Sequence, residues 1–288
     1  MAPSSALPRQ ATGVDRRRAF VDKLARGACV AATVLAIVPL VAVLIYVAAK
    51  GIGSLSLDFL TNTPAPMGEV GGGIKNAIIG TLLLVGIASL IGIPIGVITG
   101  IYLAELGRYS KFAQAVRFSA DILGGVPSIV IGVFVYTAIV LHWGYSAMAG
   151  SVSLAIIMLP TVIRTTEEML KLVPDALREA ALALGVPRWK AISSIVVRTA
   201  LPGIATGVML AVARIAGETA PLLFTAFGND AVSTSLTKPI GSLPQMIFTH
   251  STSADAEWHR QAAAGALVLV ILILVLNIGA RVFIRRRG

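Results

Sequence analysis

The sequence predicts an all-α polytopic membrane protein with six transmembrane helices. Hydrophobic residues make up 56% of the 288 residues and charged residues only 13%, whereas a soluble domain carries about 25% charged residues. A helix needs about 20 consecutive apolar residues to cross the hydrocarbon core of a membrane, and six segments of the chain meet this requirement. Because too few charges remain to cover a soluble domain, these segments are expected to lie in lipid.

The first apolar segment is expected to be a retained transmembrane helix behind a basic cytoplasmic extension. Residues 1–25 are polar and basic, with Arg16, Arg17 and Arg18 in succession. The apolar run at residues 26–49 is too long for an ordinary secretory signal and lacks a convincing cleavage site. A twin-arginine export signal is the alternative use of the arginines, but five further spans argue against that route. No function is assigned to the extension.

Five further spans follow, of which the second is rich in glycine and the third is interrupted. Gly92, Gly96 and Gly100 give the second span one smooth face for close helix packing. In the third span, Pro127 follows two glycines shortly after Asp121. A helix opened there is tolerated only against protein or a water-filled cavity, so this span is either a pathway helix or a kinked packing helix. The spans are expected at residues 74–103, 118–141, 146–163, 204–227 and 262–284.

Basic residues set the expected orientation. Most of the 24 Lys and Arg residues fall in the N-terminal extension, the loop after the second span, a long loop at residues 164–202 and the C-terminal tail. The opposite side has only Lys50, Lys75, Lys238 and Arg260. Because Lys and Arg accumulate on the cytoplasmic side, both termini and the long loop are expected in the cytoplasm. The net charge of +10 then reflects anchoring beside anionic lipids and not nucleic-acid binding.

The residues give no sign of metal, nucleotide or enzymatic chemistry in this chain. Cys29 lies within an apolar run, and His142, His250 and His259 are scattered. No Gly-Lys dipeptide occurs, so the chain lacks a P-loop and any ATP must be bound by another polypeptide. A secondary transporter or an intramembrane enzyme would need an ion site, or a nucleophile and a base, and neither is detected. We therefore expect no enzyme activity, no metal and no cofactor in this chain.

The polar stretch at residues 164–202 is the predicted contact surface for a partner protein. Pro174 and Asp175 suit the first turn of a helix, and Gly185 with Pro187 stops it. A short helix, a sharp turn and a second helix are therefore expected, with small residues that let a partner come close. An amphipathic loop without a partner is the alternative. The charged side chains of this helix pair are expected to stay in water: Arg178, Glu179, Arg188 and Lys190.

The segment at residues 192–228 is too long for one straight crossing. Pro202 and Gly203 are expected to divide it into an interfacial helix and the fifth span. That span contains Arg214, whose mid-membrane charge costs about 2.5–3.5 kcal/mol, and Glu218, about 6 Å further along the same helix face. The two form either a self-satisfied structural pair or a site where the guanidinium receives an oxyanion.

The run Glu179-Ala180-Ala181 with Gly185 is similar to the EAA motif of ABC-importer permeases. In that family the motif forms a cytoplasmic loop that docks into the ATPase subunit, so the resemblance implies a coupling role for these four residues. The generic motif continues to an Ile-x-Leu-Pro ending, from which this chain departs. Its Leu201-Pro202 pair comes three residues later, within an ALPGI ending that resembles phosphate-permease members.

Four further runs resemble the PstA family of phosphate-importer permeases, which are binding-protein-dependent transport inner-membrane components. The runs are GGGIKNAIIGTL, DILGGVPSIVIG, LPTVIRTTEEMLKLVP and RIAGETAPLLFTAF. This resemblance implies a type I importer permease fold over residues 70–284, with residues 164–202 as the coupling loop. It also implies a phosphate pathway that includes four residues: Arg164, Arg214, Glu218 and Thr219.

The same resemblance implies the partners and the location. A PstC-like sister permease would complete the pathway, a PstB-like ATPase dimer would bind ATP and Mg, and a periplasmic or lipid-anchored PstS-like protein would deliver phosphate. The complex would lie among the lipids of the bacterial inner membrane. A permease for another oxyanion, such as sulfate, molybdate or phosphonate, is the alternative.

Overall fold

The computed structural model describes residues 13–69 and 71–285, which are predominantly helical. Within these residues no strand forms, and the only β-type pairings are isolated bridges from Pro64 to Gly72 and from Phe227 to Ile240. The chain divides into two units, Met1–Ala49 and Lys50–Gly288. The second unit contains all the residues implicated in transport by the sequence.

A single long helix, α1 (Gly13–Gly51), accounts for the described part of the first unit. It begins inside the polar extension and not at residue 26, so the second half of that extension is helical. The first twelve residues of the extension lie outside the described residues. From Phe20 to Tyr46 the large apolar side chains of α1 are exposed, as expected for a helix that contacts lipid or another subunit.

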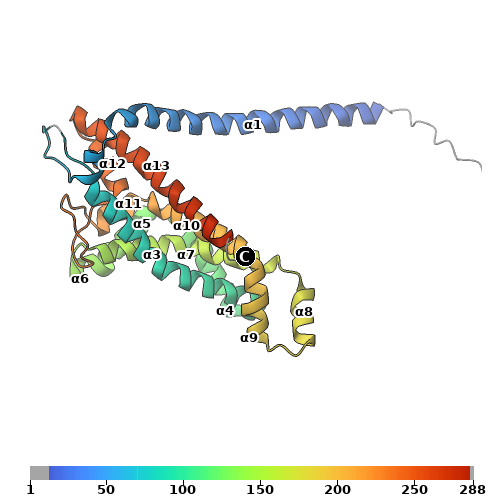
Figure 1. The fold of residues 1–288 in the computed structure, drawn as a ribbon. Coiled ribbons are helices and arrows are strands. Elements are labelled where there is room, and N and C mark those ends of the chain that lie inside the picture. The colour runs from blue at the N-terminus through green and yellow to red at the C-terminus, as the bar shows by residue number, and fades with distance from the viewer. Residues whose placement is uncertain (1–12, 70, 286–288) are drawn as a thin grey trace, which may run out of the picture. The chain divides into compact units, whose positions relative to one another are not determined.

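The second unit is a bundle of long helices joined by short helical connectors (Figure 1). Its α-helices are α2 (Leu57–Thr61), α3 (Lys75–Ile101), α4 (Lys111–Gly125), α5 (Ser128–Val135), α6 (Leu141–Trp143), α7 (Ala147–Lys171), α8 (Asp175–Ala183), α9 (Arg188–Ala191), α10 (Val197–Ala216), α11 (Ala220–Thr225), α12 (Leu243–Ser251) and α13 (Ala256–Arg285). A 3-10 turn, η1 (Ile52–Ser54), and three π-helical turns, η2 (Tyr102–Leu106), η3 (Tyr136–Val140) and η4 (Ile192–Val196), connect or extend them.

Five helical segments are long and apolar enough to cross a membrane, and a sixth span is formed if a bent pair counts as one. The five are Arg17–Ser54, Lys75–Leu106, Ala147–Lys171, Arg188–Ala216 and Ala256–Ala280. The bent pair is Lys111–Gly125 with Ser128–Trp143, which meet at 104°. The bend lies at Val126 and Pro127, where the sequence predicted that the helix opens.

Two predicted boundaries are wrong. The fourth span does not end at residue 163, because α7 continues to Lys171. The fifth span is not divided at Pro202 and Gly203, because α10 passes through both residues and ends at Ala216. Gly203 instead lets α7 approach, since an added Cβ there would overlap Met169. The helix α12, within the loop before the last span, was not predicted.

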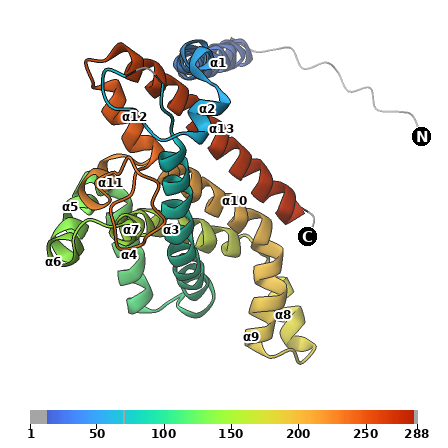
Figure 2. The ribbon, with the colours of Figure 1, turned by 60° about the vertical axis from the view of Figure 1, so that its left-hand side comes forward.

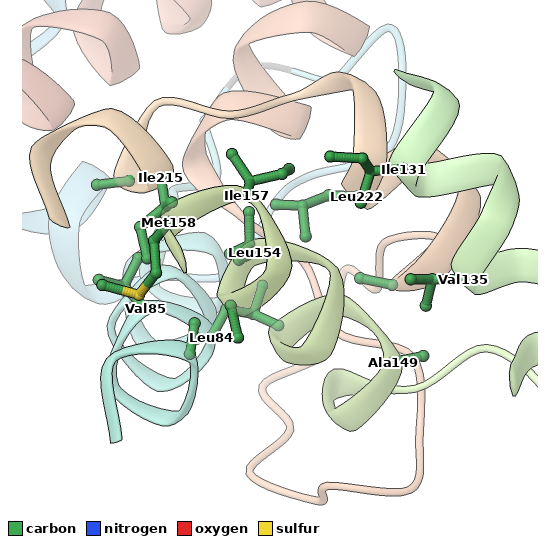
Figure 3. Packing of buried hydrophobic residues seen from close by; sticks show 14 of the residues in the cluster. Leu84, Val85, Ile131, Val135, Ala149, Leu154, Ile157, Met158, Ile215 and Leu222 are labelled. Carbon is green, nitrogen blue, oxygen red and sulfur yellow. The ribbon is translucent and has the colours of Figure 1, made fainter. Parts of the chain in front are cut away.

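The core forms where α3 packs along α7. Added Cβ atoms at Gly92, Gly96 and Gly100 would overlap Met158, Val162 and Thr166 of α7, which confirms the predicted smooth packing face. Figure 3 shows Leu84 and Val85 of α3 beside Leu154 and Met158 of α7, with Ile215 and Leu222 closing the cluster. At one end of this bundle α8 and α9 project, whereas α12 lies at the other (Figure 2). The two ends therefore offer separate surfaces.

Candidate substrate pathway and coupling surface

The predicted helix pair in the polar loop is present. Helix α8 begins at Asp175 after Pro174, and the chain turns at Gly185, whose φ of 76° lies in the left-handed region that favours glycine. Glu179 and Ala180 are exposed, while Ala181 is buried against the rest of the loop. The turn and the neighbouring helix ends also expose large apolar side chains, at Leu182, Leu184 and Trp189. An exposed apolar group of this kind is typical of a protein–protein contact.

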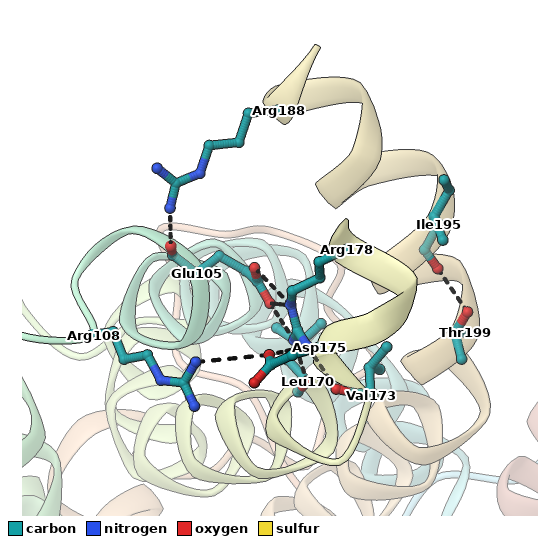
Figure 4. Close-up of polar contacts among 9 residues, drawn as sticks. All are labelled: Glu105, Arg108, Leu170, Val173, Asp175, Arg178, Arg188, Ile195 and Thr199. Carbon is teal, nitrogen blue, oxygen red and sulfur yellow. Dashed lines mark hydrogen bonds and ion pairs between the residues drawn. The ribbon is translucent and has the colours of Figure 1, made fainter. Parts of the chain in front are cut away.

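Arg178 does not stay in water, contrary to the sequence prediction. Its Nη2 donates to Glu105 Oε1 at 2.6 Å and to the Leu170 carbonyl oxygen at 2.8 Å, and its Nη1 donates to the Val173 carbonyl oxygen at 2.6 Å (Figure 4). The Glu105 side chain is only 6% exposed. The hydrogen bond to Glu105 is the main cause that raises the pKa of Arg178 above its usual value. A charged cluster therefore fastens α8 to η2, the π-helical turn that continues α3.

Arg188 strengthens the same attachment from the second helix of the pair. Its Nη2 donates to the Glu105 backbone oxygen at 2.9 Å (Figure 4). Glu105 thus receives hydrogen bonds from both sides of the turn at Gly185. The sequence carried no local signal for this cluster, because Glu105 and Arg178 are 73 residues apart.

Arg164 lies inside α7 and faces α4. Its Nε donates to Asp121 Oδ1 at 2.7 Å, and its Nη2 contacts the same oxygen. The side chains of Arg164 and Asp121 are 39% and 48% exposed. The guanidinium is therefore held by a carboxylate at a position that remains accessible to solvent or to another subunit.

A second ion cluster lies between the same two helices, and sequence reasoning missed it. Arg117 of α4 donates through Nε to Glu167 Oε1 at 2.7 Å, and Lys171 Nζ approaches the same oxygen at 2.6 Å. Glu167 is 1% exposed, so two cations compensate one buried carboxylate. The spacing of Glu167 and Lys171, four residues apart on a helix, was the available signal.

Arg214 and Glu218 are close, but they do not share a helix. Because α10 ends at Ala216, Glu218 lies in the turn before α11, and the predicted placement on one helix face is wrong. Arg214 Nε is 3.8 Å from Glu218 Oε1, which is longer than the usual hydrogen-bond range of about 2.7–3.2 Å. The Arg214 side chain is 50% exposed, and Thr219 precedes the first residue of α11.

The two arginines of the predicted pathway therefore differ. Arg164 is engaged by Asp121, whereas Arg214 makes no hydrogen bond with its guanidinium to any residue in ranges 13–69 and 71–285. Arg214 and Arg164 lie on α10 and α7, which pack against each other. A guanidinium whose N–H groups are not used within the protein can donate hydrogen bonds to the oxygens of an anion.

Comparison with solved structures shows the fold. The chain superposes on a permease chain of an alginate ABC transporter, solved with an alginate-bound periplasmic protein, with a TM-score of 0.67 at 17% identity; 94% of this chain and 96% of that chain are covered. It also superposes on a chain of the MetNI methionine ABC transporter in an inward-facing conformation, with a TM-score of 0.63 at 20% identity; 75% of this chain and 96% of that chain are covered. The predicted all-α type I importer permease fold is confirmed.

Comparison of sequences shows the family. Residues 92–288 match the family described as binding-protein-dependent transport system inner membrane component. The phosphate transport system permease protein PstA of Yersinia pestis is 52% identical over 239 residues, which cover 83% of this chain and 81% of that protein. PstA 1 of Mycobacterium tuberculosis is 39% identical over 215 residues, which cover 74% and 70% of the respective chains. The chain therefore belongs to the PstA family of binding-protein-dependent transport system inner-membrane components.

Proposed function

We propose that this chain is a membrane-spanning permease subunit of an ATP-driven importer of inorganic phosphate. The observation that carries the proposal is Arg214, a half-exposed guanidinium on an apolar helix whose nearest carboxylate stays 3.8 Å away. Placing a charged side chain within a membrane span costs free energy, so Arg214 is expected to have a function that offsets this cost. The names of the PstA relatives support phosphate as the anion.

The weak contact between Arg214 and Glu218 suits transient binding. A guanidinium presents parallel N–H donors to the oxygens of phosphate, while Glu218 keeps the free arginine compensated between ions. Phosphate must then dissociate again. A site with a single cation binds phosphate weakly enough to release it. Arg164 is a second position on the pathway, where phosphate would compete with Asp121 for the same donors. Thr219 would add a hydroxyl beside Glu218.

The coupling surface comprises Glu179, Ala180, Ala181 and Gly185 together with the exposed apolar side chains around the turn. We infer that an ATPase subunit docks there and that its movement reaches α3 through Arg178 and Glu105. Because the sequence has no P-loop, ATP and Mg would be bound by the ATPase pair, PstB-like in this interpretation, and the permease would not be an enzyme by itself.

The remaining partners follow from the pathway and the family. A PstC-like sister permease would cover the exposed faces of Arg164 and Arg214, and a PstS-like binding protein would deliver phosphate at the end of the bundle opposite α8. The distribution of Lys and Arg supports cytoplasmic termini in a bacterial inner membrane.

The proposal is tested by reconstituting this chain with its sister permease, ATPases and binding protein in proteoliposomes. Uptake of radiolabelled phosphate is expected only when ATP and every component are present, and excess sulfate, molybdate or phosphonate is expected to leave it unchanged. Uptake of another oxyanion in place of phosphate would contradict the proposal, as would phosphate uptake without ATP.

A further inference from the structure

Buried polar atoms without a partner gather in one pocket at the end of the bundle that carries α12. Among the described residues, six buried side-chain nitrogen or oxygen atoms have no hydrogen-bond partner in the protein. Four of the six belong to residues that line a single pocket of about 570 Å³: Asn76 Oδ1, Ser242 Oγ, Gln245 Oε1 and His250 Nδ1. These residues are each 6% exposed or less. An unpaired buried polar group destabilises the folded state, so their concentration indicates a built site for a polar group.

The walls of the pocket hold these side chains in place. Asn76, at the start of α3, donates through Nδ2 to the Asn229 carbonyl oxygen at 2.6 Å, which leaves its Oδ1 as a free acceptor. The His250 ring stacks on Trp258 with 4.3 Å between ring centroids and 17° between planes. Burial lowers the pKa of His250, so the imidazole is neutral near pH 7. The pocket is therefore preformed, combines polar and apolar walls, and has no positive charge among its described lining residues.

The charges of the lining residues select the class of occupant. Within residues 13–69 and 71–285, Asp230 is the one charged residue that lines the pocket, and no Lys or Arg does so. A phosphate ion would meet a carboxylate with no cation to compensate it. In contrast, the amide oxygens of Asn76 and Gln245 are acceptors, so a cation with several N–H donors would find both hydrogen bonds and an opposite charge.

The size of the pocket excludes a bare metal ion and favours a side chain. A volume of about 570 Å³ is many times the roughly 30 Å³ that one water molecule occupies in the liquid. The described residues also contain no group of three or more His, Cys, Asp or Glu side chains able to hold a metal ion. An ammonium or guanidinium group at the end of a flexible side chain fills such a space and keeps its charge beside Asp230.

Helix α12 contributes Gln245 and His250 to the pocket, and this helix lies at the end of the bundle opposite α8 and α9 (Figures 1 and 2). If ATPases dock at α8, this opposite end is the side from which a binding protein delivers its substrate. We propose that the pocket receives a Lys or Arg side chain of the substrate-binding protein, which donates to Asn76 and Gln245 and pairs with Asp230. This inference rests on the proposed function.

The test measures binding of the phosphate-loaded binding protein to the full transporter complex in lipid nanodiscs. Asp230→Asn removes the charge, and Gln245→Leu removes a buried acceptor. Asp58→Asn is the matched control, because Asp58 is an exposed carboxylate on α2, which packs at the same end through Phe59. Asp230→Asn and Gln245→Leu are each expected to weaken binding about tenfold, whereas Asp58→Asn and the basal ATPase rate are expected to stay at wild-type values.

Equal affinities of wild type and Asp230→Asn would overturn the inference. If the wild-type complex takes up phosphate but the variants bind the binding protein normally, only the pocket assignment fails; absence of phosphate uptake in wild type would refute the proposed function itself. A second measurement identifies the occupant: single Lys→Gln and Arg→Gln changes on the binding protein are combined with Asp230→Asn. One basic residue is expected to show strong non-additivity, and additivity at every basic residue would contradict a cationic occupant.

Discussion

Asp121 accepts hydrogen bonds from the guanidinium of Arg164, and an incoming oxyanion would use the same N–H donors. Both side chains are partly exposed, so under the proposed function phosphate would compete with the carboxylate for the guanidinium. We propose that Asp121 compensates the charge of Arg164 when no anion is bound and helps to displace the anion afterwards. The sequence alone indicated only that Asp121 lies near a helix opening.

Replacing Asp121 by Asn is expected to slow phosphate release from Arg164. Exposed ion pairs contribute about 0.2–1 kcal/mol, so the maximal uptake rate is expected to fall by at most about fivefold, as measured in proteoliposomes. Asp58→Asn is the control, because it removes an exposed carboxylate of α2, outside the two helices that hold this pair. An unchanged rate in Asp121→Asn would assign the pair a purely structural role.

His250 makes stability depend on pH. Burial is the main cause that lowers its pKa, while Asp230 and Asp255 act in the opposite direction. In the unfolded chain a histidine binds a proton below about pH 6.5, and in the folded chain His250 binds it only at lower pH. Stability is therefore full above about pH 6.5 and falls as the pH drops toward the folded pKa.

The melting temperature is expected to decrease from pH 7.5 to pH 5.5, and this decrease is expected to be smaller in His250→Gln than in the control His259→Gln. Equal pH profiles of the two variants would contradict this account.

At the scale of the helical elements, we propose that the attachment of α8 to η2 and α3 transmits movement from the ATPase to the pathway. Arg178→Lys keeps the charge but loses the planar fork that reaches Glu105 and two carbonyl oxygens. A hydrogen bond to a charged group contributes about 1.5–3 kcal/mol, so phosphate uptake is expected to fall about tenfold or more while ATP hydrolysis continues. Arg108→Lys is the matched control, since Arg108 is 55% exposed and 3.7 Å from Asp175. Parallel loss of uptake and hydrolysis would argue against a coupling role.

The turn between α8 and α9 depends on the backbone of Gly185. No heavy atom lies within 4 Å of an added Cβ there, but the φ of 76° strains most side chains. Gly185→Val is expected to distort the turn, at a cost of about 1–2 kcal/mol, and to reduce co-purification of the ATPase. Gly185→Asn is expected to retain it, because asparagine tolerates this backbone conformation. Retention of the ATPase by the valine variant would show that the turn is not part of the docking surface.

At the scale of the whole molecule, local patterns predicted the membrane class, the glycine packing face and the helix pair of the polar loop. They failed where distant residues decide the structure. Proline and glycine at positions 202 and 203 predicted a break, but α10 is continuous there and Gly203 packs closely against Met169 of α7. The clusters at Glu105 and Glu167 unite residues from separate helices, and no local spacing reveals most of these contacts.

We propose that Arg214 offers a transient binding site to phosphate on its passage through the membrane. The most direct measurement compares ATP-dependent phosphate uptake by wild type, Arg214→Gln and Arg198→Gln in complexes with equal assembly. Arg198 is an exposed residue of the same helix, so it controls for loss of an arginine from α10. We expect Arg214→Gln to abolish uptake and Arg198→Gln to retain it. Normal uptake by the assembled Arg214→Gln complex would contradict phosphate binding at Arg214 and would assign Arg214 and Glu218 a structural role.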